Sequence, residues 1–496
     1  MKTETNSLCP FAGSVSAVEN SDYAPGIESA FALQCEEHSY EVEHIEGRIP
    51  DFIRGTYYAN GPARFSRENF NYRHWLDGDG MVCALSFQSG SVHFANRFVR
   101  SMKFMAEQQA NRPIFRTFGT RFQGDQLRRG IALASPVNVS VYPYGESLLA
   151  FGEHGLPWEL DPVSLATRGE YTFGGRLSEV TPFSAHPKFD PGTREMFNFG
   201  VAFSAASPSL FLYRFDSHGS PVYRKRLPLP YPCSIHDFSL SPTHASFYVS
   251  PYILDMTLLR NGCTLVDSLR WQPERGTYLW VCARSTAEPL VSLALNSGYC
   301  LHHINSFEEK GSLRVDVIEY ERPIYEQYQV IPNLFGDVGP GQPVRLTVDV
   351  ESGELRDRQT IEYCRAPDFP SLDPREVGQS YRNFWMLGIS AAGQRGRKFF
   401  DQLVYADWAY DHPRGIYQAP REHYLSGEPI FVPNADRGGA GALICQIFDS
   451  RSVTSSFLVF DPFDVAAGPT ARLWLRHPIP PMFHAAFRPA VRCGHL

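Results

Sequence analysis

The sequence predicts an all-β fold, and one recurrent device is the main reason. A β-rich run ends at an acidic turn and another β-rich run begins directly after it, as in residues 160–164, 189–193, 215–219, 348–353 and 460–464. In such turns Asp accepts backbone N–H groups, Pro presets φ, and Gly adopts positive φ. The 38 prolines and 39 glycines also favour many turns over long helices.

Short antiparallel strands at this spacing can form a sandwich, a barrel or a propeller. A chain of 496 residues that folds as one unit favours the propeller, because each blade buries the faces of its neighbours. Apolar residues make up 43% of the chain and aromatic residues 14%, which is enough for a large core. We predict a single propeller domain over residues 36–496, preceded by an irregular N-terminal tail over residues 1–35.

Charge and composition exclude several classes of function. The net charge is −7 and there is no basic block, which argues against nucleic acid as a partner. The sequence has no apolar run of transmembrane length, and its start lacks the basic and apolar parts of a signal peptide, so we expect a cytoplasmic protein. The ten cysteines are dispersed and several lie inside apolar runs, which predicts reduced core residues.

Four short histidine stretches carry the candidate chemistry. They cover residues 184–188, 234–238, 301–305 and 481–485, and each lies at the edge of an apolar, strand-like run. Imidazole nitrogen suits Fe, Zn, Cu and Ni. Taken singly, each stretch is explained as well by a hydrogen-bonded histidine near a strand end, because the chain holds 16 histidines. Only a closed or repeated fold could make them converge.

The residues around these histidines resemble the carotenoid cleavage oxygenase family. The resemblance runs in order from about residue 45 to residue 489, and it is carried by residues 55–62 (GTYYANGP), 74–81 (HWLDGDGM), 185–188 (AHPK), 236–238 (HDF), 302–305 (HHIN) and 483–484 (FH). It implies a seven-bladed β-propeller with short helical segments that form a dome over the metal site. It also implies four iron ligands, one on the inner strand of each of four blades: His186, His236, His302 and His484.

Carboxylates are expected beside these ligands, because a metal-bound imidazole usually donates its other N–H to one. The family uses three glutamates in this way, and Glu153 and Glu428 match the first and the last. The middle position falls at Asp368, whose side chain is one methylene shorter. The backbone could move inward, a water could bridge the gap, or the bond could be weaker. The alternative interpretation is that these carboxylates are solvated residues at strand ends.

The resemblance implies a dioxygenase that uses one Fe²⁺ per chain and O2 as cosubstrate to cleave a C=C bond of a carotenoid or apocarotenoid into two carbonyl products. We assign no catalytic residue beyond the metal ligands. The expected partner is an apolar polyene, with no obligatory protein partner. Segment 104–118 has helix formers and then an apolar end. It is interpreted either as a surface helix packed on a blade or as part of an apolar mouth that touches membranes transiently, which would make the protein peripheral.

Three other functions stay open: a stilbene-cleaving dioxygenase, a retinoid isomerase, and a propeller that serves only as a binding scaffold. Stilbene-cleaving relatives hold the phenol with a tyrosine and with a lysine shortly before the strand of the first glutamate. Here no lysine occurs between Lys103 and Lys188. Arg128 and Arg129 are expected to face solvent at a turn, and an unpaired buried phenolate would be costly. We therefore predict a polyene substrate.

The paired histidines His302 and His303 require a choice of ligand. Neighbouring residues on a regular strand point to opposite faces of the sheet, so the two side chains cannot both face the metal. We predict that His302 is the ligand and that His303 faces the packing between blades.

Overall fold

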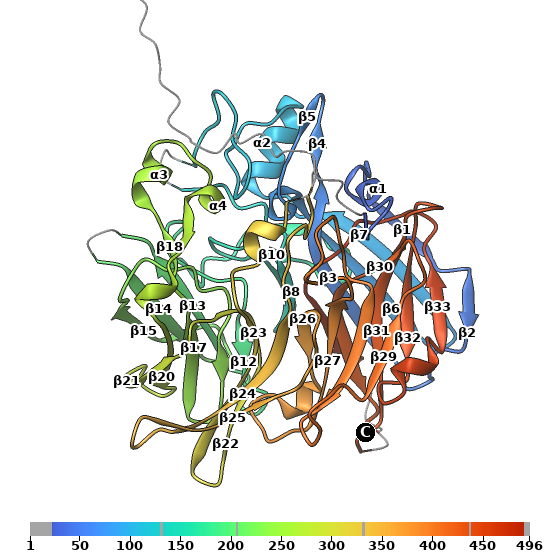
Figure 1. Ribbon diagram of the computed structural model, residues 1–496. Coiled ribbons are helices and arrows are strands. Elements are labelled where there is room, and N and C mark those ends of the chain that lie inside the picture. Colours follow the sequence, from blue (N-terminus) through green and yellow to red (C-terminus); the bar gives the residue numbers. More distant parts are fainter. Residues whose placement is uncertain (1–21, 129–131, 205–206, 330–332, 436–437, 491–496) are drawn as a thin grey trace, which may run out of the picture.

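The computed structural model describes residues 22–128, 132–204, 207–329, 333–435 and 438–490. Their strands form seven antiparallel sheets of four or five strands, arranged as the blades of a propeller (Figure 1). The seven-bladed all-β fold is therefore confirmed.

Five blades have four strands each, and the chain builds each of them from the axis outward. They are β8 (Ser140–Tyr144), β9 (Ser147–Phe151), β10 (Trp158–Leu160) and β11 (Thr167–Glu170); β12 (Lys188–Phe189), β13 (Met196–Ala202), β14 (Ser209–Phe215) and β15 (Pro221–Pro228); β16 (Ser239–Leu240), β17 (His244–Val249), β20 (Thr277–Ala283) and β21 (Pro289–Leu295); β22 (Tyr299–Glu309), β23 (Ser312–Tyr320), β24 (Gly341–Asp349) and β25 (Glu354–Thr360); β26 (Ala366–Ser371), β27 (Asn383–Ile389), β28 (Gln402–Asp407) and β29 (Gly415–Gln418).

The two remaining blades have five strands and close the ring. From the axis outward they are β34 (Ala485–Pro489), β3 (Gly55–Arg64), β6 (Asp79–Gln88), β7 (Ser91–Phe98) and β1 (His38–Glu41); and β30 (His423–Pro433), β31 (Gly441–Asp449), β32 (Thr454–Phe460), β33 (Ala471–Trp474) and β2 (Ile45–Gly47). The C-terminal strand β34 pairs with β3, and β2 pairs with β33. Strands from both ends of the chain are thus hydrogen-bonded into the ring. The innermost strands contact one another along most of the ring, from β16 through β22, β26, β30 and β34 to β8.

The acidic turns between strands form as predicted. Asp161 accepts the backbone N–H groups of Val163 and Ser164 at 3.0 and 2.8 Å. These hydrogen bonds stabilise the carboxylate and lower the pKa of Asp161 to about 2. The turns that begin at Asp190 and Asp349 are built in the same way.

Short inserted elements gather at one end of the propeller (Figure 1). They include α2 (Met102–Ala110), α3 (Met256–Arg260), α4 (Leu265–Ser268) and the hairpins β4–β5 (Ser66–Arg67, Phe70–Asn71) and β18–β19 (Tyr252–Leu254, Leu269–Trp271). The remaining short turns of 3₁₀ helix are η1 (Trp75–Asp77), η2 (Pro273–Arg275), η3 (Tyr325–Gln327), η4 (Pro374–Glu376) and η5 (Val465–Ala467). No helix among the described residues is long and apolar enough to cross a membrane. The cysteines of the described residues form no disulfide bond, and all but Cys364 are buried.

The N-terminal segment differs in part from the prediction. Residues 1–21 lie outside the described residues. Residues 22–35 are not simply irregular, because α1 (Glu28–Phe31) forms there and Ala30 and Phe31 are buried. The Phe31 ring meets the rings of Phe65 and Trp75 edge-on at 5.1 and 5.9 Å. Apolar contacts tie this part of the predicted tail to the core, and the domain boundary at residue 35 stays a prediction.

Helix α2 packs on the blade that contains β6 and β7, as one of the two interpretations of segment 104–118 expected. Its anchor is Lys103, which is fully buried and whose ammonium lies 2.8 Å from Asp79 and 2.9 Å from Glu107. Arg67 pairs with the same two carboxylates. Burial alone would lower the pKa of Lys103, but the carboxylates raise it above its usual value, so the side chain stays charged.

Replacing Lys103 with methionine should destabilise the fold strongly. The variant keeps the side-chain length but leaves two buried carboxylates without this cation, a change that costs about 3–5 kcal/mol. The free energy of unfolding from urea titration measures the loss. Arg48→Met is the control, because Arg48 and Asp51 form an exposed pair at 2.9 Å. Its effect should stay within about 0.5 kcal/mol. Equal effects in the two variants would contradict the anchoring role.

Candidate metal centre

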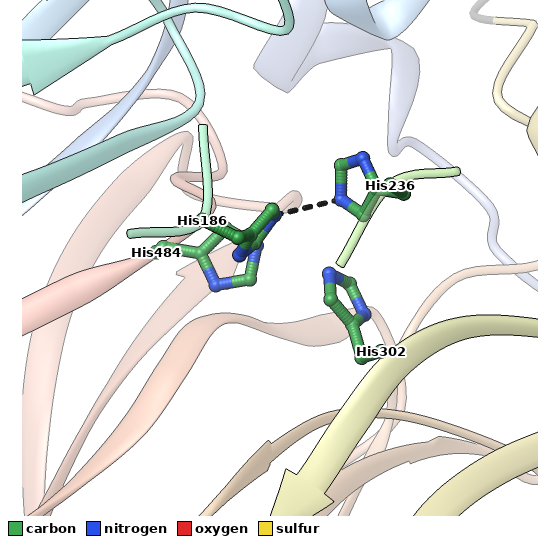
Figure 2. Close-up of side chains that lie close together, drawn as sticks. All are labelled: His186, His236, His302 and His484. Carbon is green, nitrogen blue, oxygen red and sulfur yellow. Dashed lines mark hydrogen bonds between the residues drawn. The ribbon is translucent and has the colours of Figure 1, made fainter. Parts of the chain in front are cut away.

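The structure brings together four histidines that the sequence keeps far apart. His302 lies in the inner strand β22, as expected, but the other three lie just before their inner strands: His186 is two residues before β12, His236 is three residues before β16, and His484 immediately precedes β34. Figure 2 shows the four rings converging, and one ring nitrogen from each lies within 4.8 Å of the others. The Nε2 atoms of His186 and His236 are 2.8 Å apart. All four side chains are buried.

The two neighbouring histidines of β22 point in different directions. His302 joins the cluster, whereas His303 Nδ1 lies 3.1 Å from Ser239 Oγ on the next blade. The strand is irregular here, since the β22–β23 register shifts on both sides of His303. The predicted orientations are therefore observed, although local bulging contributes to them as well as regular alternation.

Three carboxylates lie against three of the imidazole rings, and they are the three residues named from the sequence. His236 Nδ1 lies 2.9 Å from Glu153 Oε2, and His484 Nδ1 lies 3.2 Å from Glu428 Oε2. His302 Nδ1 lies 2.5 Å from Asp368 Oδ1. Histidines from four blades and carboxylates from the other three meet at the axis, so every blade contributes to the centre.

The shorter side chain of Asp368 reaches His302 without a bridging group. In the β26–β27 ladder the pairing register shifts after Asp368, and the next residue, Phe369, has a φ of 51°. A bulge with a left-handed residue bends the strand locally, and it costs energy for any residue except glycine. The direct contact excludes a bridging water, and the bulge supports the first of the three explanations considered for the missing methylene, an inward shift of the backbone.

His186 is held differently from the other three histidines. Its Nδ1 lies 3.9 Å from Asp237 Oδ1, too far for a hydrogen bond. Asp237 instead pairs with Lys188 at 2.8 Å and accepts the backbone N–H of His303 at 2.9 Å. The Asp237 carboxylate thus connects the strands that carry His186, His236 and His302. The sequence offered a signal for it, because Asp237 and Lys188 lie inside two of the quoted motifs.

Burial favours the neutral imidazole, which can donate a lone pair, at His186 and His484, whereas a carboxylate opposes it at His302. Burial, followed by the other histidines, holds the pKa of His186 well below its usual range. Burial also lowers the pKa of His484. At His302 burial acts in the same direction, but the Asp368 carboxylate outweighs it and raises the pKa. His302 Nε2 is buried without a hydrogen-bond partner. An all-nitrogen set with such an orphaned atom fits a transition metal ion.

Two tyrosines in the connection between β23 and β24, which belongs to the dome over the metal centre, were not predicted as part of the site. Tyr325 Oη donates to Glu153 at 2.7 Å, and Tyr328 Oη donates to Asp368 Oδ2 at 3.0 Å. Their i,i+3 spacing within a short run of helix formers was the available signal, because residues at that spacing share a helix face.

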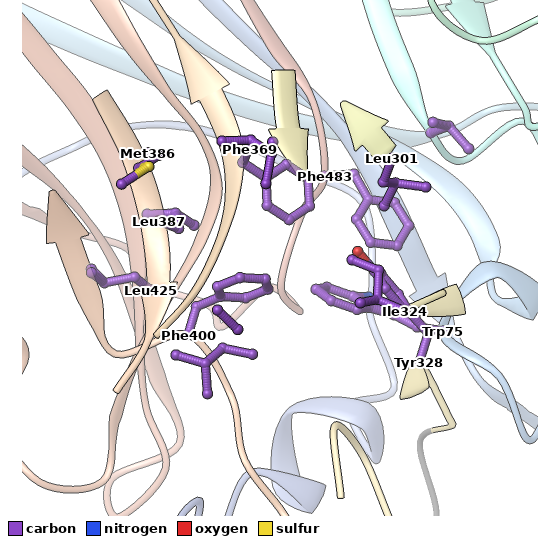
Figure 3. Packing of buried hydrophobic residues seen from close by; sticks show 14 of the residues in the cluster. Trp75, Leu301, Ile324, Tyr328, Phe369, Met386, Leu387, Phe400, Leu425 and Phe483 are labelled. Atoms are coloured by element: carbon purple, nitrogen blue, oxygen red, sulfur yellow. The ribbon is translucent and has the colours of Figure 1, made fainter. Parts of the chain in front are cut away.

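Aromatic side chains close one side of the centre. Figure 3 shows Trp75, Phe369, Phe400 and Phe483 packed together, with Tyr328 beside them. The centroids of the Trp75 and Phe483 rings are 4.4 Å apart, and the Phe369 ring lies 5.1 Å from that of His484. This packing fixes the ring positions and keeps water away from the histidines.

A cleft of about 470 Å³ approaches the centre beside Glu153. Part of its wall is apolar and is formed by Phe118, Leu133, Phe183, Phe199, Leu254 and Met256. Figure 1 places α3 and α4, which border this cleft, at the same end of the propeller as α2. An elongated apolar molecule is the kind of ligand that such a wall favours.

The cations in the described lining of the cleft are all paired. Lys103 is held by two carboxylates, and Arg116 pairs with Asp125 at 2.9 Å. Arg128 was expected to face solvent, and this is corrected. It lines the cleft and pairs with Glu170 at 3.1 Å and with Glu179 at 2.7 Å. Arg129 lies outside the described residues.

Comparison with known proteins identifies the family. Residues 31–489 match the family model described as RPE65, retinal pigment epithelial membrane protein. The chain belongs to this family, the carotenoid oxygenases. This carotenoid oxygenase is 31% identical over 490 residues to an apocarotenoid-15,15'-oxygenase of Synechocystis, covering 94% of this chain and 96% of the relative. The resemblance seen in the sequence is confirmed.

Other relatives of this carotenoid oxygenase are named for smaller substrates. An isoeugenol monooxygenase of Pseudomonas nitroreducens is 28% identical, covering 90% and 94% of the two chains, and a resveratrol cleavage oxygenase of Aspergillus fumigatus is 28% identical, covering 85% and 86%. The solved structure of the cobalt-substituted Synechocystis oxygenase matches with a TM-score of 0.85 at 28% identity, over 95% of this chain and 100% of that chain. All the named relatives are oxygenases, and the four-histidine centre is consistent with a non-haem iron enzyme of this kind.

Proposed function

We propose that the protein is an Fe²⁺-dependent dioxygenase that cleaves a C=C bond of an apocarotenoid or carotenoid into two carbonyl products. The observation that carries the proposal is a cluster of four buried imidazoles connected through Glu153, the partner of His236, to an apolar cleft whose described cations are all paired. O2 is the cosubstrate.

His186, His236, His302 and His484 would hold one iron ion per chain. Nitrogen ligands suit Fe and other transition metals, whereas oxygen ligands suit Mg and Ca. When bound, the iron supplies the oxygen-activating chemistry of the reaction.

The chain's own residues position the groups that react. Glu153, Asp368 and Glu428 accept the Nδ1–H groups of their histidines, which fixes the tautomer and presents Nε2 toward the centre. Contact with the apolar wall of the cleft stabilises the bound polyene by about 25 cal/mol for each Å² of its surface that is removed from water. No protein acid or base is required, because the double bond is itself oxidised.

The second candidate is a phenolic substrate, favoured by the relatives named for isoeugenol and resveratrol. A bound phenolate needs a cationic partner in a cleft of this kind, because an unpaired buried charge is costly. Lys103, Arg116 and Arg128 are each already paired with carboxylates. Because these cations are not free to bind a phenolate, the cleft favours a polyene over a phenolic substrate.

We expect the iron-loaded enzyme to cleave long apocarotenals and to cleave 4-hydroxystilbenes about 5- to 150-fold less efficiently. A phenol left without its partner costs about 1–3 kcal/mol, and each 1.4 kcal/mol corresponds to a factor of ten. The measurement is kcat/KM for both classes of substrate under the same conditions. Leu133→Lys, which adds an ammonium to the cleft wall, should narrow the ratio. Faster turnover of the hydroxystilbene by the unaltered enzyme would overturn the polyene assignment.

The contact with a membrane surface stays a prediction. Met105 on α2 and Val180 at the cleft are large apolar residues that are 52% and 55% exposed, which supports it. The cytoplasmic location and the absence of an obligatory protein partner stay predictions as well.

A further inference from the structure

We propose that Tyr325 and Tyr328 are positioning residues of the metal centre, and that one turn of the dome sets the orientation of two ligand histidines through them. The inference rests on the proposed metal site. It concerns a segment far from the ligands in sequence, within the connection between β23 and β24.

The two hydroxyls reach two different carboxylate–histidine pairs. Tyr325 Oη donates to Glu153 Oε1 at 2.7 Å, and the same carboxylate holds His236. The Tyr325 hydroxyl also contacts His236 Nδ1 directly.

In the second pair, Asp368 and His302, each carboxylate oxygen has a separate hydrogen-bond donor. Tyr328 Oη donates to Asp368 Oδ2 at 3.0 Å, while Oδ1 lies 2.5 Å from His302 Nδ1. Each oxygen of the Asp368 carboxylate therefore has its own donor. The tyrosine restricts rotation of the carboxylate and keeps Oδ1 aimed at the imidazole, as is typical of outer partners that orient metal ligands.

Both tyrosines are suited to donate. Their side chains are about 2% and 3% exposed. A phenol is protonated at neutral pH, so each hydroxyl has a proton to donate. A protonated phenol beside a carboxylate makes a charge-assisted hydrogen bond, which is stronger than one between neutral groups.

The turn itself is held by the HWLD segment, residues 74–77, whose role the metal site does not explain. His74 Nε2 lies 2.9 Å from the carbonyl oxygen of Tyr325, and the Trp75 N–H donates to that of Tyr328 at 2.9 Å. His74 Nδ1 accepts the Leu76 N–H at 3.2 Å, so Nε2 carries the proton and donates. The 74–77 segment thus fixes the backbone of both tyrosines.

A second dome segment is tied to the same support. Asp77 accepts the Gly119 N–H at 2.8 Å and the Thr120 hydroxyl at 2.5 Å. Phe118, which lines the cleft, immediately precedes Gly119 and packs edge-on against the Tyr325 ring at 5.5 Å. The HWLD segment therefore places the cleft wall and the two tyrosines relative to each other.

The test compares Tyr325→Phe and Tyr328→Phe with a matched tyrosine elsewhere. Tyr381→Phe is the control, because Tyr381 is also buried and donates to a buried carboxylate, that of Asp316, at 2.6 Å. Asp316 pairs with Arg345 rather than with a histidine. Phenylalanine keeps the ring in each case and removes only the hydroxyl.

The readout is Co²⁺ affinity from chelator competition, together with the visible absorption of the bound Co²⁺ and the melting temperature of the metal-free protein. We expect Tyr325→Phe and Tyr328→Phe to weaken Co²⁺ binding about tenfold, the lower end of losses from outer partners, and to shift the absorption bands. Tyr381→Phe should change the melting temperature but not the affinity or the spectrum.

Two results would overturn the proposal, and they are distinguishable. Co²⁺ affinity within about twofold of wild type in both variants would leave the tyrosines with a packing role only. Failure of the unaltered protein to bind any transition metal would overturn this inference and the proposed function together. A normal wild-type affinity with unaffected variants would leave the proposed function standing.

Discussion

His302→Ala should abolish metal binding and oxygenase activity, whereas His303→Ala should retain the metal. His302 contributes a nitrogen to the cluster and is fixed by Asp368 at 2.5 Å, so its removal deletes a ligand and leaves a buried carboxylate without its partner. His303 contacts Ser239 instead and lies outside the cluster. Elemental analysis of the purified variants gives the metal content, and product formation from an apocarotenal gives the activity.

The adjacent histidine is a demanding control for this prediction. Both side chains are buried, at 3% and 5% exposure, so a general effect of emptying a buried site would appear in both variants. Burial also lowers the pKa of His303 to about 4, so it stays neutral and its loss removes no charge. Stoichiometric metal in His302→Ala, or its loss only from His303→Ala, would reverse the ligand assignment.

The fold was predictable because the acidic turns have a local cause. Asp161 and its counterparts satisfy backbone groups within their own turn, and that pattern is visible in the sequence. The number of blades was not countable from the strands. The inner strands β12 and β16 have only two residues each, too short for any periodicity. The count came from the family resemblance.

The candidate site was predictable where motifs carried it and not where tertiary structure decided it. The four histidines lie in quoted motifs, the three carboxylates were placed from the family resemblance, and the structure brings all of them together. The left-handed conformation of Phe369 has no local signal, since such residues are usually glycine. Arg128 was misplaced because its partners Glu170 and Glu179 come from distant segments of the sequence.

Asp368→Ala should lower metal affinity or turnover by roughly 10–100-fold, the usual loss when the partner of a ligand histidine is removed. The carboxylate is buried and accepts from His302, from the hydroxyl of Tyr328 and from the Phe369 N–H at 2.9 Å. Truncation leaves these buried donors without their acceptor, and it frees the imidazole to rotate. Burial would raise the pKa of Asp368, but His302 and these hydrogen bonds lower it, so the carboxylate is charged.

Asp368→Glu tests whether metal affinity depends more on the carboxylate itself or on the bulge that positions it. It restores the family's usual residue, and we expect metal affinity and kcat much closer to wild type than in Asp368→Ala, because the retained charge can still accept from His302 Nδ1. Glu428→Ala is the variant for comparison, because the Glu428 carboxylate is 20% exposed and lies 3.2 Å from His484. A weaker, more hydrated contact should cost less when it is removed. Metal content and rate unchanged in Asp368→Ala would leave Asp368 as a strand residue with no part in holding the metal.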